Sequence, residues 1–152
     1  MPLPAPRAGS VRRAVLDTNV LVSGAILSAG APAEILTAWR ERRFDLVIGP
    51  TILSELDRVL HLPKIARRYS LDPHDVQGLL DLLSVRAVVV TERHTVSAVL
   101  RDPKDNPILS CAVEGQADCI VTRDRDLLDL GQFRDIPIVS PAAFRRMLLV
   151  GG

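Results

Sequence analysis

Apolar residues along the chain follow two alternating patterns, which predict the order of its secondary-structure elements. Short unbroken aliphatic runs are typical of strands buried on both faces of a parallel sheet. They predict five strands, at residues 13–16, 45–49, 86–91, 118–122 and 136–140. Between these runs, apolar residues recur at helical spacing. Helices are predicted at residues 32–43, 50–62, 63–69, 72–84, 105–115, 125–130 and 141–149.

Residues at the predicted helix ends support this assignment. Pro50 and Pro73 stand where the first turn of a helix tolerates proline, and Asp72 can cap the helix that follows it. Gly115 closes the helix predicted at 105–115. Strands that alternate with helices imply right-handed crossovers and a parallel sheet. We therefore expect an α/β fold, a three-layer α/β/α sandwich with a five-stranded parallel sheet.

The length of 152 residues fits one domain, which we place at residues 12–150 behind a flexible N-terminal tail at 1–11. The apolar run 20–33 is too short for a bilayer, which needs about 20 residues, and the N-terminus has no apolar signal core. With Cys111 and Cys119 as its only cysteines, the chain is expected to be a reduced, cytoplasmic protein without membrane contact. Its net charge of +1 excludes a uniformly basic nucleic-acid coat, so a polyanion would need a local basic patch.

Carboxylates follow two of the predicted strands. Asp17 ends the first strand and Asp124 lies just beyond the fourth. Ligands of open α/β sheets bind at the carboxyl ends of the strands, so these two acids are expected to face one crevice. Asp124 could instead be a helix N-cap, but a carboxylate at the end of a buried strand such as Asp17 is costly without a partner.

Two further acids could join this crevice, and for each the spacing leaves a rival. Glu55 and Asp57 border opposite sides of the same apolar helix stripe. Asp105 begins a predicted helix and could cap it, and Asp102 lies three residues earlier. Carboxylates gathered in one crevice repel one another unless a cation offsets their charge. Oxygen ligands without nearby His or Cys favour Mg²⁺ or Mn²⁺ over zinc.

Four sequence blocks, in order, resemble the PIN domain family. They read "VLDTNVLVS", "SELDRVL", "DPKDNPIL" and "IVTRDRDLL", and the resemblance covers about residues 13–149. It is nearest to the family's toxin members related to VapC ribonucleases. The resemblance implies a metal site built from four acids with a fifth candidate, and it selects Glu55 over Asp57 and Asp105 over Asp102. These acids are Asp17, Glu55, Asp105, Asp124 and Asp126.

The resemblance also implies supporting roles around that metal site. Thr18 or Asn19 would support it through hydrogen bonds, and Thr122 would shape its floor. Basic residues beside the acids are candidates for RNA phosphate contacts, although plain surface charge explains them equally well. These residues are Lys104, Arg123 and Arg125.

The function implied by the resemblance is metal-dependent endonucleolytic cleavage of RNA by the toxin of a type II toxin–antitoxin system. It further implies a small antitoxin as partner and a homodimer. Two alternatives stay open at this point. One is a degenerate PIN module that binds RNA or protein without catalysis. The other is a haloacid-dehalogenase-type phosphohydrolase, although that class needs an acid where this chain has Asn19.

Overall fold

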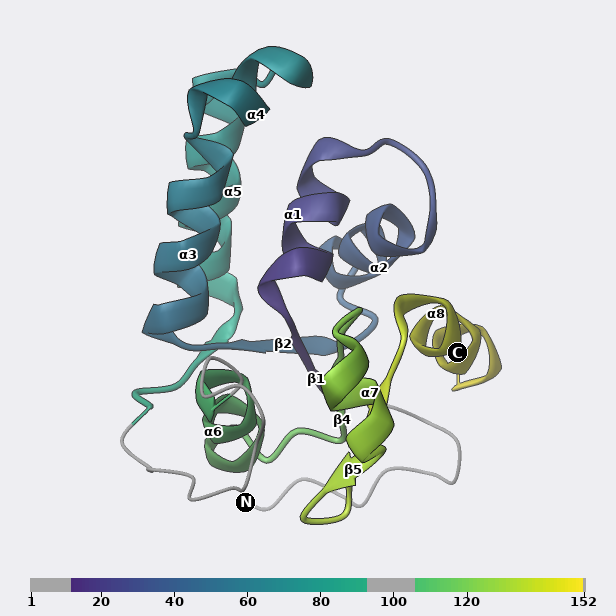
Figure 1. The fold of residues 1–152 in the computed structure, drawn as a ribbon. Coiled ribbons are helices and arrows are strands. Elements are labelled where there is room, and N and C mark those ends of the chain that lie inside the picture. Colours follow the sequence, from purple (N-terminus) through teal and green to yellow (C-terminus); the bar gives the residue numbers. More distant parts are fainter. Residues whose placement is uncertain (1–11, 93–105, 152) are drawn as a thin grey trace.

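The computed structural model describes residues 12–92 and 106–151. Helices and strands alternate along most of this part of the chain (Figure 1). The strands are β1 (Arg13–Leu16), β2 (Asp45–Ile48), β3 (Val88–Val89), β4 (Cys119–Val121), β5 (Gln132–Phe133) and β6 (Ile136–Val139). The helices are α1 (Thr18–Ile26), α2 (Ala31–Arg40), α3 (Pro50–Leu60), α4 (Pro63–Arg68), α5 (Pro73–Arg86), α6 (Asn106–Glu114), α7 (Arg125–Leu130) and α8 (Pro141–Gly151).

The strands form one sheet in the order β3-β2-β1-β4-β6-β5. All neighbouring pairs are parallel except β5 and β6, which are antiparallel. The chain leaves β1 for β2 on one side and later returns to β4 on the other. The direction of strand order therefore reverses at β1, and the carboxyl ends of β1 and β4 border the crevice where ligands bind in such sheets.

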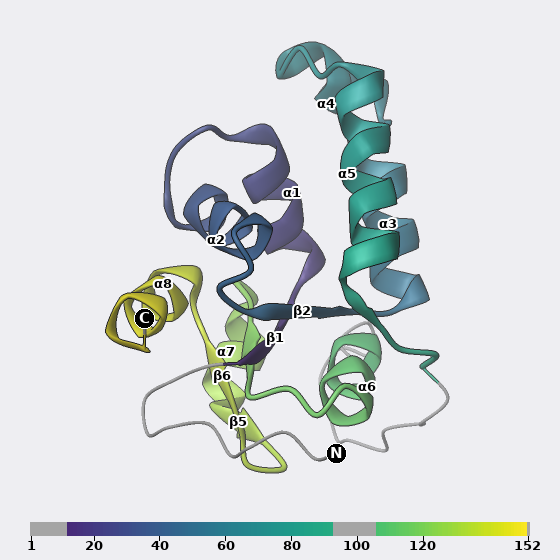
Figure 2. The ribbon, with the colours of Figure 1, turned by 180° about the vertical axis from the view of Figure 1, so that it is seen from behind.

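The core lies on both faces of the central strands. Ala14, Val15 and Leu16 have no solvent exposure, and neither do the residues of β4. In both views α6 lies across β2 from α1 and α2, so helices cover both faces of the sheet (Figures 1 and 2). The expected α/β sandwich is confirmed. Helices α3 and α5 pack side by side and extend away from the sheet, with α4 at their far end (Figure 1).

Three elements differ from the sequence prediction. The sheet has six strands, not five, because the two-residue β5 is too short to leave an apolar pattern. The third strand is Val88–Val89, much shorter than the predicted 86–91, because α5 continues to Arg86. Helix α1 was not predicted. It is buried on several sides and contains β-branched residues and a glycine, so it shows no amphipathic period.

No single helix in the described ranges is long and apolar enough to cross a membrane. Only α1 and α2 taken together reach that length and composition, and they meet at an angle of 88°.

Candidate functional site

Asp17 lies where β1 ends and α1 begins, and it serves both elements. Its backbone N–H donates to the carbonyl oxygen of Val121 at 2.9 Å, which ties the end of β1 to the end of β4. Its side chain is the N-cap of α1, with Oδ1 accepting from the Thr18 N–H at 2.8 Å. The carboxylate is therefore fixed at the reversal point of the sheet, facing the N-terminus of a helix, where negative charge is stabilised.

Thr122, directly after β4, connects Asp17 with Asp124. Its fully buried hydroxyl donates to Asp17 Oδ2 at 2.7 Å and accepts from the Asp124 N–H at 3.0 Å. A threonine hydroxyl can donate one hydrogen bond and accept others, so this residue serves both neighbours at once. The Asn19 side-chain amide adds a longer contact to the same Asp17 oxygen, at 3.4 Å.

Asp124 is the N-cap of α7, as one of the two sequence interpretations predicted. Its Oδ1 accepts from the N–H groups of Asp126 and Leu127, at 2.8 and 3.3 Å. These bonds occupy one carboxylate oxygen and leave Oδ2 without a hydrogen-bond donor among the described residues. Capping and ligation are therefore compatible, because the cap holds the carboxylate in place through one oxygen only.

Glu55 and Asp57, which helical spacing could not separate, have different surroundings in the structure. Glu55 Oε2 accepts from the Thr18 hydroxyl at 3.3 Å, which connects α3 to the start of α1 beside Asp17. Asp57 instead faces His61, the C-cap of α3, whose Nδ1 lies 2.8 Å from Asp57 Oδ1. The structure therefore brings Glu55 to the Asp17 neighbourhood and places Asp57 in a local surface pair.

The electrostatics of Asp17 show that it feels the charges of the other two acids. Burial raises the pKa of Asp17, and the hydrogen bonds from Thr122 and Thr18 oppose that rise. The charges of Asp124 and Glu55 raise the pKa further. Three carboxylates contributed by β1, α3 and the β4–α7 connection thus share one electrostatic environment, although they are far apart along the chain.

The remaining predicted residues fall into two groups. Arg123 is exposed and donates from Nη1 to the Ser23 hydroxyl on α1 at 3.2 Å, while Arg125 is exposed at the start of α7. Asp126, in the first turn of α7, is also exposed. Three residues lie outside the described part of the chain, so the structure does not place them. They are Asp102, Lys104 and Asp105.

The donor set suits a hard divalent cation. Its side chains offer carboxylate oxygens, the ligand type that Mg²⁺ and Mn²⁺ prefer. A cation would offset both the burial of the Asp17 charge and its repulsion by Asp124 and Glu55. Within residues 12–92 and 106–151, no three His, Cys, Asp or Glu side chains stand close enough to enclose an ion. Ligation by Asp17, Glu55 and Asp124 would therefore need side-chain adjustment or bridging water molecules.

Comparison with known proteins agrees with this geometry. A family model described as PIN domain matches residues 13–126, three quarters of the chain and the span that holds all the predicted acids. The chain belongs to the PIN domain family. Over 118 residues it is also 32% identical to an uncharacterised protein of Methanocaldococcus jannaschii, MJ1680, covering 78% of this chain and 74% of that protein.

The PIN fold assignment is supported by a solved structure as well. The chain resembles a chain in the crystal structure of VapBC2 from Rickettsia felis bound to a DNA fragment from their promoter. The TM-score is 0.57 at 15% identity, and the match covers 84% of this chain and 98% of that one. Membership of the PIN family supports nuclease chemistry for this chain.

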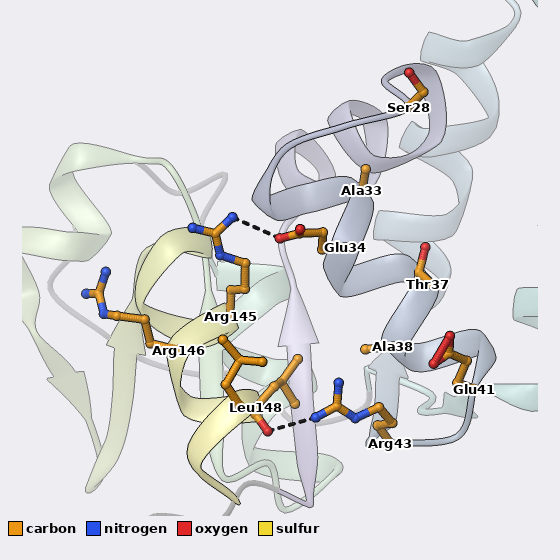
Figure 3. A pocket seen from close by; sticks show the side chains of 11 residues that line it. Ser28, Ala33, Glu34, Thr37, Ala38, Glu41, Arg43, Arg145, Arg146 and Leu148 are labelled. Carbon is orange, nitrogen blue, oxygen red and sulfur yellow. Dashed lines mark hydrogen bonds and ion pairs between the residues drawn. The ribbon is translucent and has the colours of Figure 1, made fainter. Parts of the chain in front are cut away.

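Two grooves of this PIN domain lie away from Asp17, Glu55 and Asp124. One, of ≈ 480 Å³, runs between α2 and α8; Figure 3 shows the Glu34–Arg145 ion pair across it and the bond from Arg43 to the Leu148 carbonyl. The other, of ≈ 490 Å³, is lined by residues of α1, α2 and α5, including Ala25, Arg40 and Leu79. Since neither is lined by Asp17, Glu55 or Asp124, groove volume does not locate the chemistry here.

Sequence reasoning missed two residues that contact the elements carrying this site. Ser23 on α1 holds Arg123, but α1 itself was not predicted, so nothing indicated the contact. Glu92 contacts the first turn of α3 from 41 residues away. Only tertiary packing brings such distant segments together, and no local pattern could have revealed it.

Proposed function

We propose that this PIN domain protein is a metal-dependent endoribonuclease. Its active site would be the set of acidic side chains near the carboxyl ends of β1 and β4. The observation that carries the proposal is the position of Asp17. It lies at the reversal point of the sheet, where burial raises its pKa and the charges of Asp124 and Glu55 raise the pKa further. The PIN family match over residues 13–126 supports nuclease chemistry at these acids.

In this proposal Asp17, Glu55, Asp105 and Asp124 hold one or two Mg²⁺ or Mn²⁺ ions, with Asp126 as a further candidate. A bound divalent ion supplies an activated water and offsets the charge that develops on the phosphate. The chain's own residues orient this chemistry. Thr122 and Thr18 hold the Asp17 carboxylate from two sides through hydrogen bonds. Attack of the activated water on the phosphorus would leave products with 5′-phosphate and 3′-hydroxyl ends.

Recognition of RNA would depend on phosphate contacts and on the shape of the strand. Arg123 is held beside α1 by Ser23, and Arg125 projects from the adjacent helix start. With Lys104 they are the proposed phosphate contacts. The chain has only three Phe, one Trp and one Tyr, so base stacking offers little for sequence recognition.

We extend the proposal to a cytoplasmic toxin that acts as a homodimer and is silenced by a small antitoxin. The fold shared with a chain of the VapBC2 structure supports the toxin and antitoxin part of this extension. Induced expression of the chain should arrest growth, and the Asp17→Asn variant should not. Coexpression of a small protein encoded beside the chain should restore growth, and sedimentation at micromolar concentration should give twice the mass of the 16.6 kDa chain.

The decisive experiment compares RNA cleavage by matched variants of two carboxylates on α3. The wild type should cut single-stranded RNA with Mg²⁺ or Mn²⁺ and lose this activity in EDTA. Glu55→Gln should lower the cleavage rate at least about a hundredfold, since second-sphere changes at metal sites already cost up to that much. Asp57→Asn, which disturbs only the pair with His61, should cleave like the wild type.

Each contrary outcome identifies a different error. Cleavage that survives EDTA would overturn metal dependence. RNA binding without cleavage or metal uptake would favour the non-catalytic PIN module, whose supporting observation is the lack of a closed ligand shell among the described residues. Release of inorganic phosphate from small phosphomonoesters would favour the phosphohydrolase, against the PIN family match.

A further inference from the structure

The three residues after β3, at 90–92, connect three separate elements of the fold. The Val90 N–H donates to the Ile48 carbonyl at the end of β2, at 2.9 Å. The Thr91 hydroxyl donates to Glu114 Oε1 at the end of α6, at 3.0 Å. The Glu92 carboxylate reaches the first turn of α3. This segment therefore joins β2, α6 and α3 at the edge of the sheet that carries the candidate active site.

Glu92 supplies the cap that α3 lacks. The N-cap position of α3 is Gly49, which has no side chain to accept from the first N–H groups. Glu92 takes over this role, with Oε1 accepting from the Thr51 N–H at 2.9 Å and Oε2 accepting from the Thr51 hydroxyl at 2.6 Å. Both oxygens of the carboxylate thus hold one residue, and the N-terminal end of the helix favours the negative charge.

Gly49 leaves the space that this contact needs. A Cβ atom at Gly49 would overlap Glu92 Oε1 and the Cys111 Sγ atom of α6. The φ of Gly49 is −117°, a conformation that any residue adopts, so the backbone alone does not require glycine. The Cys111 thiol also lies 3.9 Å from Glu92 Oε1, so the partly exposed carboxylate lies between α3 and α6.

The backbone at Glu92 is itself unusual. Its φ is +59°, in the left-handed region that residues other than glycine rarely adopt. Such a conformation persists only where surrounding contacts fix it. Here the two bonds to Thr51 do so, together with the pairing of Val90 to β2.

Thr51 stands four residues before Glu55, so the two side chains lie on the same face of α3, one turn apart. Among the described residues, one hydrogen bond orients Glu55, the 3.3 Å contact from the Thr18 hydroxyl. We propose that Glu92 is a positioning residue, which fixes the rotation of α3 through Thr51 and thereby aims Glu55 at Asp17. This inference rests on the proposed function, because it gives Glu92 a role in forming the metal site.

The experiment measures Mn²⁺ affinity of the full chain by calorimetry, well below the unfolding temperature. Glu92→Ala should raise the Mn²⁺ Kd roughly tenfold, the lower range for residues that orient metal ligands. Glu92→Gln should stay close to the wild type, since its amide oxygen can accept from the Thr51 N–H and its NH₂ can donate to the hydroxyl. The matched control is Glu41→Ala, at an exposed glutamate on the groove between α2 and α8. This variant should have the same Mn²⁺ Kd as the wild type.

A second comparison separates positioning from a general loss of structure. In a Glu55→Gln background, Glu92→Ala should cause no further loss of Mn²⁺ affinity, because Glu92 acts through Glu55. If Glu92→Ala does not fold, Thr51→Val tests the same contact by deleting only the hydroxyl. This variant should raise the Kd in the same direction and show the same dependence on Glu55.

The outcomes distinguish the inference from the proposed function. Wild-type Mn²⁺ affinity in both Glu92→Ala and Thr51→Val, or losses that add independently to that of Glu55→Gln, would overturn the positioning role alone. An equal loss of Mn²⁺ affinity in Glu92→Gln and Glu92→Ala would also overturn the positioning role. The charge of Glu92, and not its hydrogen bonds to Thr51, would then account for the loss. A wild-type chain that binds no Mn²⁺ would overturn the proposed function and this inference together.

Discussion

The Thr122 hydroxyl donates a 2.7 Å hydrogen bond to Asp17 Oδ2, joining residues 105 positions apart in the sequence. The same hydroxyl accepts from the Asp124 N–H at 3.0 Å. One buried side chain thus sets the relative placement of the acids that follow β1 and β4. It couples the stability of the sheet edge to the geometry of the candidate metal site.

Replacing Thr122 should therefore affect both stability and metal binding. Thr122→Val keeps the shape but leaves the Asp124 N–H without its acceptor and removes a donor from Asp17, at a cost of about 1–3 kcal/mol. The Mn²⁺ Kd should rise roughly ten- to a hundredfold. Urea unfolding and calorimetry measure the two effects. Thr122→Ser retains the hydroxyl, so its free energy of unfolding and its Mn²⁺ Kd should stay close to those of the wild type. Equal losses in Thr122→Val and Thr122→Ser would contradict a role for the hydroxyl.

Asp17→Asn should separate function from stability. Burial raises the pKa of Asp17 above the ordinary 3.8, so the folded protein binds this proton more tightly than the unfolded chain does. Its contribution to metal-free stability is greatest below pH 3.8 and is lost as the pH rises through the folded-state pKa. At pH 7 in EDTA, the neutral Asn should therefore melt at the same temperature as the wild type or higher.

Scanning fluorimetry at pH 4 and pH 7, with EDTA or with Mg²⁺, tests this prediction. Mg²⁺ should raise the melting temperature of the wild type but not of Asp17→Asn, because only a site that binds the ion is stabilised by it. The variant should also cleave RNA at least about a hundredfold more slowly. A variant that melts well below the wild type at pH 7 in EDTA would show that the carboxylate, through its charge or its second acceptor oxygen, stabilises the fold.

Arg123 should contribute to RNA binding and not to metal binding. Arg123→Ala removes one phosphate contact, so affinity should fall for all sequences alike, and the salt slope of log K should decrease by about one. Fluorescence anisotropy across a salt series measures the slope, and calorimetry should find unchanged Mn²⁺ affinity. Arg67→Ala, on α4 at the far end of the α3–α5 pair, serves as the control. Equal effects of the two variants would indicate non-specific surface charge.

The two cysteines should be unreactive in the folded protein. Burial is the main reason that the pKa of both Cys111 and Cys119 is raised from 9.0 to about 12. The nearby charges of Glu92 and Glu114 also raise the pKa of Cys111. The charge of Asp118 also raises the pKa of Cys119. At pH 8 this leaves roughly a thousandfold less thiolate than in the unfolded chain. A disulfide-exchange reagent such as DTNB should label both thiols in urea and neither one promptly without it.

The same shifts set a direction for stability at alkaline pH. A thiol whose folded-state pKa is raised contributes stability that is complete below pH 9 and is lost as the pH rises towards 12. The free energy of unfolding should therefore decline above pH 9. A Cys119→Ala variant should show a shallower decline, and an unchanged slope would contradict the assignment.

Two acids of the candidate site follow from local sequence features. Asp17 at the end of an aliphatic run and Asp124 before a helix are visible because strands and caps leave short-range patterns. Glu55 was harder to identify. Helical spacing left Asp57 as its equal, and only the packing of α3 against α1 places Glu55 against Thr18 while Asp57 pairs with His61. Glu92 left no local signal, because its partner Thr51 lies on another element.

Periodicity and capping act over a few residues, so local sequence patterns predict the alternation of strands and helices, the parallel sheet and the acids at the strand ends. The order β3-β2-β1-β4-β6-β5, and with it which acids come near one another, depends on tertiary packing. Strand order depends on how whole faces of strands and helices pack together. Asp17 and Thr122 are therefore neighbours through the burial of β1 beside β4, which no single stretch of sequence encodes.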